Sequence, residues 1–582
     1  MTVAISTVHA ASGTNDDGAN RIRKRFEDAT SRRIDAHGTI RHGARAEAIS
    51  RLKKQQKYIE TPLAEQPQWT SLGPRSTGGR VKSILIHPTD PNILYIGAAA
   101  GGVWKSTNAG GTWIPIMDDA NGIATGSLCF HPENPDIIYV GTGEQVQNAN
   151  TYLGAGLLRS TDAGVTWSTV GLTDVGSFSR VYVHPANPSI IMVSCMNTNG
   201  GVYRSEDGGS TWSRKLSGQV YDMSINPSDP NEWFVSLPDS GIYHTQDAGA
   251  TWQQRINGIS GSIGRISIQQ SSMNEDVLFA LVELDNLAHI YRSNNKGQVW
   301  TRQYVDGQGC FFSGSCSPSG SQGFYDNYIY ISPHNDQVVF AGGIDIWRTT
   351  NGGSTWQNMT QGYGDGNGAN APHVDQHCLA IHPENANIVY AGNDGGMLRS
   401  TNGGVSWSVI NDNLSITQFY SFDLDPTDRR RNFGGTQDNG TLGTFGQTEW
   451  DTMAGGDGMI TIVDYGNPNR FYGNYPNGVI YRYQINPRQQ SIVMDGVDDS
   501  EPAGWVAPLK MSPHDPATLY HGRRRMYLTN LSGDVWYPIS DPMPNGLLVT
   551  AIEVSPADPT VVWAGSNGGD LLVTDTEGEE WT

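Results

Sequence analysis

The octapeptide STNAGGTW at residues 106–113 decides the fold of this chain, because close copies of it recur along the sequence. The copies are STDAGVTW (160–167), SEDGGSTW (205–212), TQDAGATW (245–252), SNNKGQVW (293–300), TTNGGSTW (349–356) and STNGGVSW (400–407), and a decayed copy, TDTEGEEW, ends at Trp581. The first seven tryptophans stand 40 to 56 residues apart. A fixed period of this length indicates a repeat architecture in which each unit is one small sheet.

A second pattern precedes each octapeptide, as in SILIHPTDPNILYIG (83–97), SLCFHPENPDIIYVG (127–141) and LAIHPENANIVYAG (379–392). It reads as a β-branched strand, a proline-bounded turn and a second strand, after which glycines lead into a third strand. The tryptophan then opens a fourth strand. Four-stranded antiparallel meanders repeated radially form a β-propeller, so we predict an all-β chain of tandem β-propellers.

Eleven repeats can be recognised, and their quality falls after Trp407. We therefore predict three segments. Residues 1–66 form a charged helical leader or pro-segment, residues 67–411 a seven-bladed first propeller, and residues 412–582 a second propeller with about four recognisable blades. Whether the second propeller is complete stays open, and residues 68–72 (QWTSL) read as a strand without a blade.

Charge and cysteine content restrict the partners and the compartment. The formal net charge is −20, and residues 1–66 contribute 12 basic and 8 acidic residues, so the body of the chain is strongly acidic. An acidic body disfavours nucleic acid, whose binding draws on cationic side chains. The loop CFFSGSC (310–316) could close a small disulfide ring, which persists only in an oxidising compartment. We predict an extracellular, periplasmic or cell-surface protein without a membrane-inserted segment, although MTVAISTVHAASG at the N-terminus lacks a basic signal-peptide region.

The octapeptide resembles the Asp box of BNR-repeat β-propellers, which occurs in sialidases, sortilin-type receptors and xyloglucanases. The resemblance implies a structural turn in which the aspartate satisfies backbone amides and the tryptophan packs beneath. The residues to which it gives this role are Asp162, Asp207, Asp247, Trp113, Trp167, Trp212, Trp252, Trp356 and Trp407.

Exported bacterial BNR-repeat proteins, similar to the N-terminal part of sortilins, share HVDQH (373–377), GNDGG (392–396), TQFY (417–420), GGTQDNGT (434–441) and GGDG (455–458) with this chain. The resemblance to two-propeller xyloglucanases is more distant. The positions that match their two catalytic aspartates hold Ala99 and Ser421 here. The resemblance therefore implies the fold and export, and does not carry over the xyloglucanase catalytic pair.

Strand direction predicts where a site lies. The first-strand entries and second-strand exits of every blade emerge on one face, and the octapeptides emerge on the other. The first face carries the candidate ligand-binding residues Glu144, Asp326, Asp345, His373, Asp375, His377, Asp394 and Asp438, with Asp457. In an extended segment His373, Asp375 and His377 would point to one side, as metal ligands or an acid/base pair require.

These residues allow several kinds of site. Asp375, His377 and Asp394 are candidate metal ligands, with a structural calcium as the candidate cofactor. Asp375, Asp394, Asp438 and Asp457 are candidate catalytic carboxylates. The alternative is a polar propeller centre that satisfies backbone groups and ordered water. Basic residues on the same face, Arg75, Arg80 and residues 523–525, could hold an anionic group or simply be solvated.

The leading hypothesis is a glycan- or protein-recognition module that binds through its acidic face. A glycoside hydrolase or polysaccharide lyase using the carboxylates and histidines of that face is the first alternative, and a receptor-like or assembly scaffold is the second. The expected partner is a polysaccharide or an extracellular protein. The sequence does not reveal the ligand or the oligomeric state.

Overall fold

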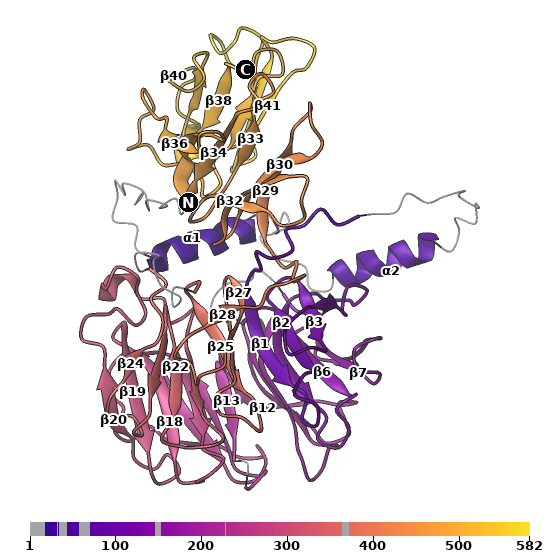
Figure 1. The fold of residues 1–582 in the computed structure, drawn as a ribbon, viewed down its shortest axis with the longest axis vertical. Coiled ribbons are helices and arrows are strands. Elements are labelled where there is room, and N and C mark those ends of the chain that lie inside the picture. The colour runs from indigo at the N-terminus through magenta and orange to yellow at the C-terminus, as the bar shows by residue number, and fades with distance from the viewer. Residues whose placement is uncertain are drawn as a thin grey trace. The chain divides into compact units, whose positions relative to one another are not determined.

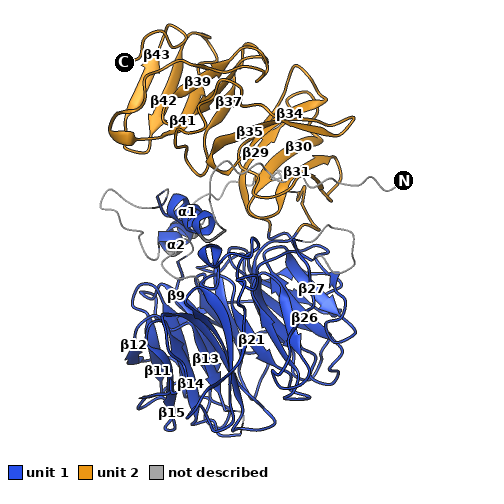
Figure 2. Ribbon diagram, turned by 90° about the vertical axis from the view of Figure 1, so that its left-hand side faces the viewer, with its two compact units in different colours: residues 1–67, 78–416 blue, residues 68–77, 417–582 orange. Residues whose placement is uncertain are grey.

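The structure is a computed structural model that describes residues 18–31, 33, 44–56, 70–145, 153–226, 228–363 and 372–582. Almost all regular structure is antiparallel β-sheet (Figure 1). The chain divides into two compact units, Met1–Pro67 with Gly78–Ile416, and Gln68–Thr77 with Thr417–Thr582 (Figure 2). Within the described residues, no helix is both long and apolar enough to cross a membrane.

The described strands of the first unit form seven four-stranded sheets, each a meander in chain order. In sequence these sheets are β1 (Val81–Ile86), β2 (Leu94–Ala98), β3 (Gly102–Ser106), β4 (Ile114–Pro115); β5 (Thr125–Phe130), β6 (Ile138–Thr142), β7 (Leu157–Ser160), β8 (Ser168–Gly171); β9 (Ser177–Val183), β10 (Ile191–Met196), β11 (Gly201–Ser205), β12 (Ser213–Ser217); β13 (Asp222–Ile225), β14 (Trp233–Leu237), β15 (Gly241–Thr245), β16 (Gln253–Gln254); β17 (Ile263–Gln270), β18 (Leu278–Leu284), β19 (Leu287–Ser293), β20 (Thr301–Val305); β21 (Tyr328–Ile331), β22 (Val339–Gly342), β23 (Ile346–Thr349), β24 (Gln357–Asn358); β25 (Gln376–Ile381), β26 (Val389–Asn393), β27 (Gly396–Ser400) and β28 (Ser408–Val409). The predicted fold of four-stranded propeller blades is confirmed.

The first unit closes into a ring, because its first and seventh sheets pack together. Val81 of β1 shares a hydrophobic cluster with Tyr390 and Met397 of the seventh sheet. The Cys378 thiol donates a hydrogen bond to the Val81 carbonyl, and the Trp113 indole N–H donates one to the carbonyl of Ile410, 2.8 Å away. Closing the ring covers the faces of the first and last sheets, which would otherwise be exposed.

Each octapeptide forms the turn between the third and fourth strands of its blade. In the copy at 205–212, Asp207 accepts hydrogen bonds from the Thr211 amide (2.8 Å) and hydroxyl (2.7 Å), and these bonds lower its pKa to about 2. The Ser205 hydroxyl donates to Asp207 and accepts from the Gly209 amide. The same carboxylate contacts recur at Asp162 and Asp247, while Asn108, Asn295, Asn351 and Asn402 use their side-chain oxygens in the same way.

The second unit contains three four-stranded sheets and a final three-stranded one among its described residues. They are β29 (Phe419–Leu424), β30 (Arg431–Thr436), β31 (Gly440–Phe445), β32 (Asp451–Ala454); β33 (Thr461–Val463), β34 (Arg470–Tyr475), β35 (Val479–Gln484), β36 (Gln489–Ile492); β37 (Leu509–Met511), β38 (Leu519–Gly522), β39 (Met526–Thr529), β40 (Tyr537–Pro538); β41 (Val549–Val554), β42 (Val562–Ser566) and β43 (Leu571–Thr574).

The segment 70–77 belongs to the second unit and contains no strand. It runs along the approach to β32 instead, where the Trp450 indole donates to the Leu72 carbonyl (2.8 Å) and the Arg75 amide donates to the Thr448 carbonyl (3.1 Å). The strand predicted at residues 68–72 is therefore absent from residues 70–72, and residues 68 and 69 lie outside the described ranges.

The predicted helical leader contains two helices, α1 (Gly18–Ser31) and α2 (Ala44–Gln56). Helix α1 buries a stripe formed by Ile22, Arg25 and Phe26, which are spaced as one face of a helix requires. Ile22 and Phe26 pack against Phe324 and Tyr325 of the first unit. The loop before these aromatics contains the predicted disulfide between Cys310 and Cys316.

Candidate functional site

A buried charged cluster fills the centre of the face that the sequence predicted to carry a site. We call it the axial cluster, and its members are Arg80, Lys82, Glu144, Tyr325, Asp326, Asp375, His377 and Asp394. Arg80 donates to Asp394 (2.9 Å) and to Glu144 (2.6 Å), and all three side chains are buried. The closed ring brings the axial cluster together from the first, second, sixth and seventh blades.

Asp394 is the acceptor on which the cluster converges. His377 Nε2 and the Tyr325 hydroxyl each donate to it across 2.6 Å, and the Lys82 ammonium group donates to His377 Nδ1 across 3.2 Å. Burial opposes ionisation of Asp394, but Arg80 and His377 hold its pKa well below the usual range. Burial lowers the pKa of Lys82 to about 7 and that of His377 to about 3.

The surroundings of two further carboxyl groups of the cluster favour the protonated form. Burial and the nearby Asp394 raise the pKa of Asp375 to about 6, and Gln322 donates to its carboxyl group (2.8 Å). Burial and the nearby Asp375 raise the pKa of Asp326 well above its usual range. Neutral carboxyl groups avoid the cost of burying an unpaired negative charge.

The structure brings Glu144, Asp326, Asp375, His377 and Asp394 together, as the strand-direction argument predicted. The extended conformation on which the one-sided arrangement of His373, Asp375 and His377 depends is interrupted, because Asp375 has a φ of +64° and β25 begins only at Gln376. The three side chains therefore take separate partners. His373 Nδ1 donates to the Val374 carbonyl, whereas Asp375 pairs with Gln322 and His377 with Asp394.

The remaining candidates lie elsewhere. Asp345 accepts hydrogen bonds from the side chains of Asn358 (2.9 Å) and Thr360 (2.8 Å). It thereby links the start of β23 to the end of β24 within its own blade. Asp438 and Asp457 belong to the second unit, where the Asp438 amide donates to the Asp457 carboxylate across 3.0 Å. They thus form a separate local contact.

The basic candidates have protein partners. Arg80 is buried in the axial cluster. Arg523 is also buried and donates to backbone carbonyls of Asn477, Asp499 and Glu501, while Arg525 forms a 2.7 Å ion pair with the Glu501 carboxylate. Arg75 is half-buried beside Thr448. The expectation that Arg80 and Arg523 are solvated is wrong, because the blades enclose both side chains.

No group of three or more His, Cys, Asp or Glu side chains in the described residues could hold a metal ion. Asp394 is engaged by Arg80, Tyr325 and His377, and cations surround it. The predicted structural calcium at Asp375, His377 and Asp394 gains no support from this arrangement and stays a prediction.

Helix α1 covers the axial cluster. The Arg25 guanidinium group, 4% exposed as a residue, lies 5.2 Å from the centre of the Tyr325 ring, and the Phe26 ring meets the same tyrosine at 6.1 Å. The positive charge of Arg25 helps to lower the pKa values of Asp375 and Asp394 beneath it. The axial cluster is therefore a closed structural centre, and an open site has to lie beside it.

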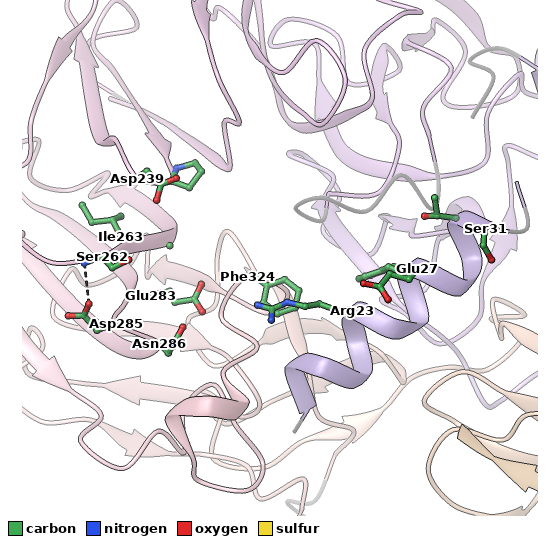
Figure 3. Close-up of a pocket in the computed structure, with 14 residues that line it drawn as sticks. Arg23, Glu27, Ser31, Asp239, Ser262, Ile263, Glu283, Asp285, Asn286 and Phe324 are labelled. Carbon is green, nitrogen blue, oxygen red and sulfur yellow. Dashed lines mark hydrogen bonds between the residues drawn. The ribbon is translucent and has the colours of Figure 1, made fainter. Parts of the chain in front are cut away.

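A cavity of about 930 Å³ lies on this side, between helix α1 and the fourth and fifth blades (Figure 3). We call it the helix-side cavity. Its wall on α1 consists of Arg23, Phe26, Glu27, Thr30 and Ser31, and its propeller wall consists of Pro238, Asp239, Ser262, Ile263, Gly264, Glu283, Asp285, Asn286 and Phe324.

Glu283 is the buried carboxyl group of this cavity. Burial raises its pKa above the usual range, and the Ser321 hydroxyl donates to it across 2.9 Å. Asp285 accepts a bond from the Ser262 amide (3.1 Å), and Arg23 projects from α1 over the Phe324 ring, 5.3 Å from its centre (Figure 3). The cavity thus combines a buried carboxyl group of raised pKa with further acidic groups at its wall.

The candidates selected from the sequence do not include any residue of the helix-side cavity. The strand-direction rule, which selected polar residues where the second strand of a blade ends, could also have selected Glu283 and Asp285. Both lie at the end of β18, the second strand of the fifth blade. Asp239 stands at the corresponding place after β14. The contribution of α1 had no sequence signal, since its blade partners lie more than 200 residues away.

The fold and the helix-side cavity define a β-propeller protein with a carboxylate-lined cavity. No protein-family model matches the sequence. The chain is 24% identical over 318 residues to a xyloglucanase of Acetivibrio thermocellus, a match covering 48% of this chain and 32% of that protein. It is 25% identical over 312 residues to a xyloglucanase of Hypocrea jecorina, covering 50% and 34%. The matched region thus spans about a third of each relative's length.

A solved structure extends this similarity to the fold of nearly the whole chain. The crystal structure of an ancestral GH74 enzyme matches with a TM-score of 0.63 and 17% sequence identity, covering 89% of this chain and 78% of that one. This likeness shows the fold. Ala99 and Ser421 hold the positions at which the sequence resemblance implied the xyloglucanase aspartates. Ala99 is buried after β2, and the Ser421 hydroxyl in β29 donates to the Met459 carbonyl.

Proposed function

We propose that this chain binds a polysaccharide in the helix-side cavity and hydrolyses its glycosidic bonds, with Glu283 as the proton donor. The observation that carries the proposal is the buried Glu283 carboxyl group, whose raised pKa favours the protonated form at the wall of an open cavity. Glycoside hydrolysis needs a carboxylic acid that protonates the leaving oxygen.

The second requirement is an ionised carboxylate that acts as nucleophile or activates water. Asp285, Asp239 and Glu27 line the same cavity and supply the candidates for this role. A volume of about 930 Å³ falls within the range of known ligand sites and accommodates several sugar units.

The comparisons support a polysaccharide as the ligand, because the curated relatives are named xyloglucanases. The Cys310–Cys316 disulfide supports a location in an oxidising compartment, where polysaccharides of cell walls and matrices are accessible. We therefore place the proposed activity outside the cytoplasm.

One observation favours recognition without cleavage. Ala99 and Ser421 offer no carboxylate at the positions matched to the xyloglucanase pair. A chain that retained the fold and lost this pair would bind glycans through the same cavity and leave them intact. Binding and cleavage therefore have to be measured separately.

The test uses a panel of soluble polysaccharides that includes xyloglucan, mixed-linkage β-glucan, mannan and polygalacturonate. Each is assayed for binding by affinity electrophoresis and for the release of new reducing ends. Glu283→Gln removes the ionisable carboxyl proton and nearly preserves the shape of the side chain. Glu133 is exposed and lies outside the cavity, so Glu133→Gln is the matched control.

We expect Glu283→Gln to lower cleavage by at least about a hundredfold and to leave binding nearly unchanged. Binding by the wild type without new reducing ends would reject hydrolysis of those glycans and favour the recognition module. Full cleavage by Glu283→Gln would reject Glu283 as the proton donor.

A further inference from the structure

Helix α1 faces the axial cluster with Arg25 and the helix-side cavity with Arg23 and Glu27, while Phe26 borders both. Ile22, Arg25 and Phe26 are buried against the propeller, and this stripe anchors the helix. The neighbouring stripe, which includes Arg23 and Glu27, lines the helix-side cavity (Figure 3). Packing of Ile22 and Phe26 against the propeller therefore holds Arg23 and Glu27 at the wall of the cavity.

Arg23 is the cationic side chain of the cavity wall. Its guanidinium group lies over the Phe324 ring, 5.3 Å from the ring centre, and therefore covers an aromatic face on which a sugar ring would otherwise stack. At this part of the cavity wall, the guanidinium group of Arg23 supplies several N–H donors in one plane. Hydroxyl oxygens of a sugar can accept hydrogen bonds from them.

We propose that helix α1 is an integral wall of the ligand site and that Arg23 is a positioning residue, which orients ligand hydroxyl groups in the cavity that Glu283 also lines. This inference rests on the proposed function and adds to it a role for the segment that precedes the propeller. The sequence alone interpreted that segment as a leader or pro-segment.

The electrostatic part of the inference follows from the charges that face Glu283. They are Arg265 of β17, Arg23 and Glu27 of α1, Asp239 after β14, and Asp285 after β18. Burial is the largest influence and raises the Glu283 pKa, while the Ser321 hydroxyl, Arg265 and Arg23 act in the opposite direction. Removing the positive charge of Arg23 should therefore let the Glu283 pKa rise further.

The experiment compares Arg23→Gln with Arg21→Gln, which removes the same charge from an exposed position of α1 that does not line the cavity. The measurements are polysaccharide affinity, the pH profile of kcat and the melting temperature. We expect Arg23→Gln to weaken binding about tenfold. Since a proton donor loses activity as pH rises through its pKa, we expect the alkaline limb to move upward by less than about one pH unit.

Arg23→Lys separates the two roles, because lysine keeps the charge and loses the planar fork. It should restore the wild-type alkaline limb and leave binding weakened. Should Arg23→Gln match Arg21→Gln in affinity and pH profile while Glu283→Gln abolishes cleavage, the role of α1 is refuted and the proposed function stands. A wild type that neither binds nor cleaves any glycan of the panel refutes the proposed function for these glycans, and the role of Arg23 with it.

Discussion

Tyr325 donates a 2.6 Å hydrogen bond to Asp394, and this contact connects the sixth and seventh blades beneath helix α1. Phe26 and Arg25 of helix α1 also contact the ring of Tyr325. A single side chain thus couples the helix to the axial cluster.

Replacing Tyr325 with phenylalanine should destabilise the first unit. The substitution keeps the ring contacts with α1 and removes one donor from a buried, ionised carboxylate, which costs about 2 kcal/mol. Urea denaturation of Tyr325→Phe and of Tyr537→Phe, where the ring is half exposed, measures the difference. Equal denaturation midpoints in the two variants would show that the bond contributes nothing.

The axial cluster should also make stability depend on pH. The pKa of Asp375 is about 6, above its value in an unfolded chain, so the native state holds this proton more tightly. The contribution is complete below about pH 4 and is lost as pH rises through 6. We expect the stability of the wild type relative to Asp375→Asn to fall by roughly 2 kcal/mol between pH 4 and pH 7.

Asparagine suits this test because it tolerates the positive φ of Asp375. Asp136→Asn changes the same charge at an exposed position and serves as the control. Chemical denaturation curves at several pH values supply the measurement. A constant difference between wild type and Asp375→Asn across this range would exclude a raised pKa.

The turn of the third blade offers a prediction about the repeat itself. The Ser205 hydroxyl is buried, donates to Asp207 and accepts from the Gly209 amide across 2.8 Å. Ser205→Ala leaves that buried amide without its acceptor, which costs about 1 to 3 kcal/mol. Asp207→Asn should be nearly neutral, because asparagine occupies the same position in four other copies. Thermal unfolding of the two variants distinguishes them, and equal melting temperatures would contradict the assigned roles.

The blades could be predicted from the sequence because their signals are local. A tryptophan such as Trp113 directly precedes a fourth strand, β4, and the glycine turn before it has a fixed length. The helices of the leader were also predictable from the absence of turn residues.

The partners within the site could not be predicted, since they depend on ring closure. Arg80 and Asp394 are 314 residues apart and meet only because the first and seventh blades adjoin. The strand-direction argument placed Arg80 and Asp394 on one face of the propeller. The sequence around each residue did not indicate that the two form an ion pair. The left-handed conformation of Asp375 likewise breaks an alternation that the sequence suggested.

The charge state of Glu283 can be tested without any ligand. Burial raises its pKa, so the native state favours the protonated form, and its contribution to stability is full below the pKa of an unfolded glutamate and is lost as pH rises. Glutamine stays neutral at every pH. The melting temperature of Glu283→Gln relative to the wild type should therefore increase as pH rises above the pKa of an unfolded glutamate, whereas that of Glu133→Gln should not follow this trend. A relative melting temperature that fell with rising pH would mean that Glu283 is ionised in the native protein, and the group would then be unsuited to donate a proton.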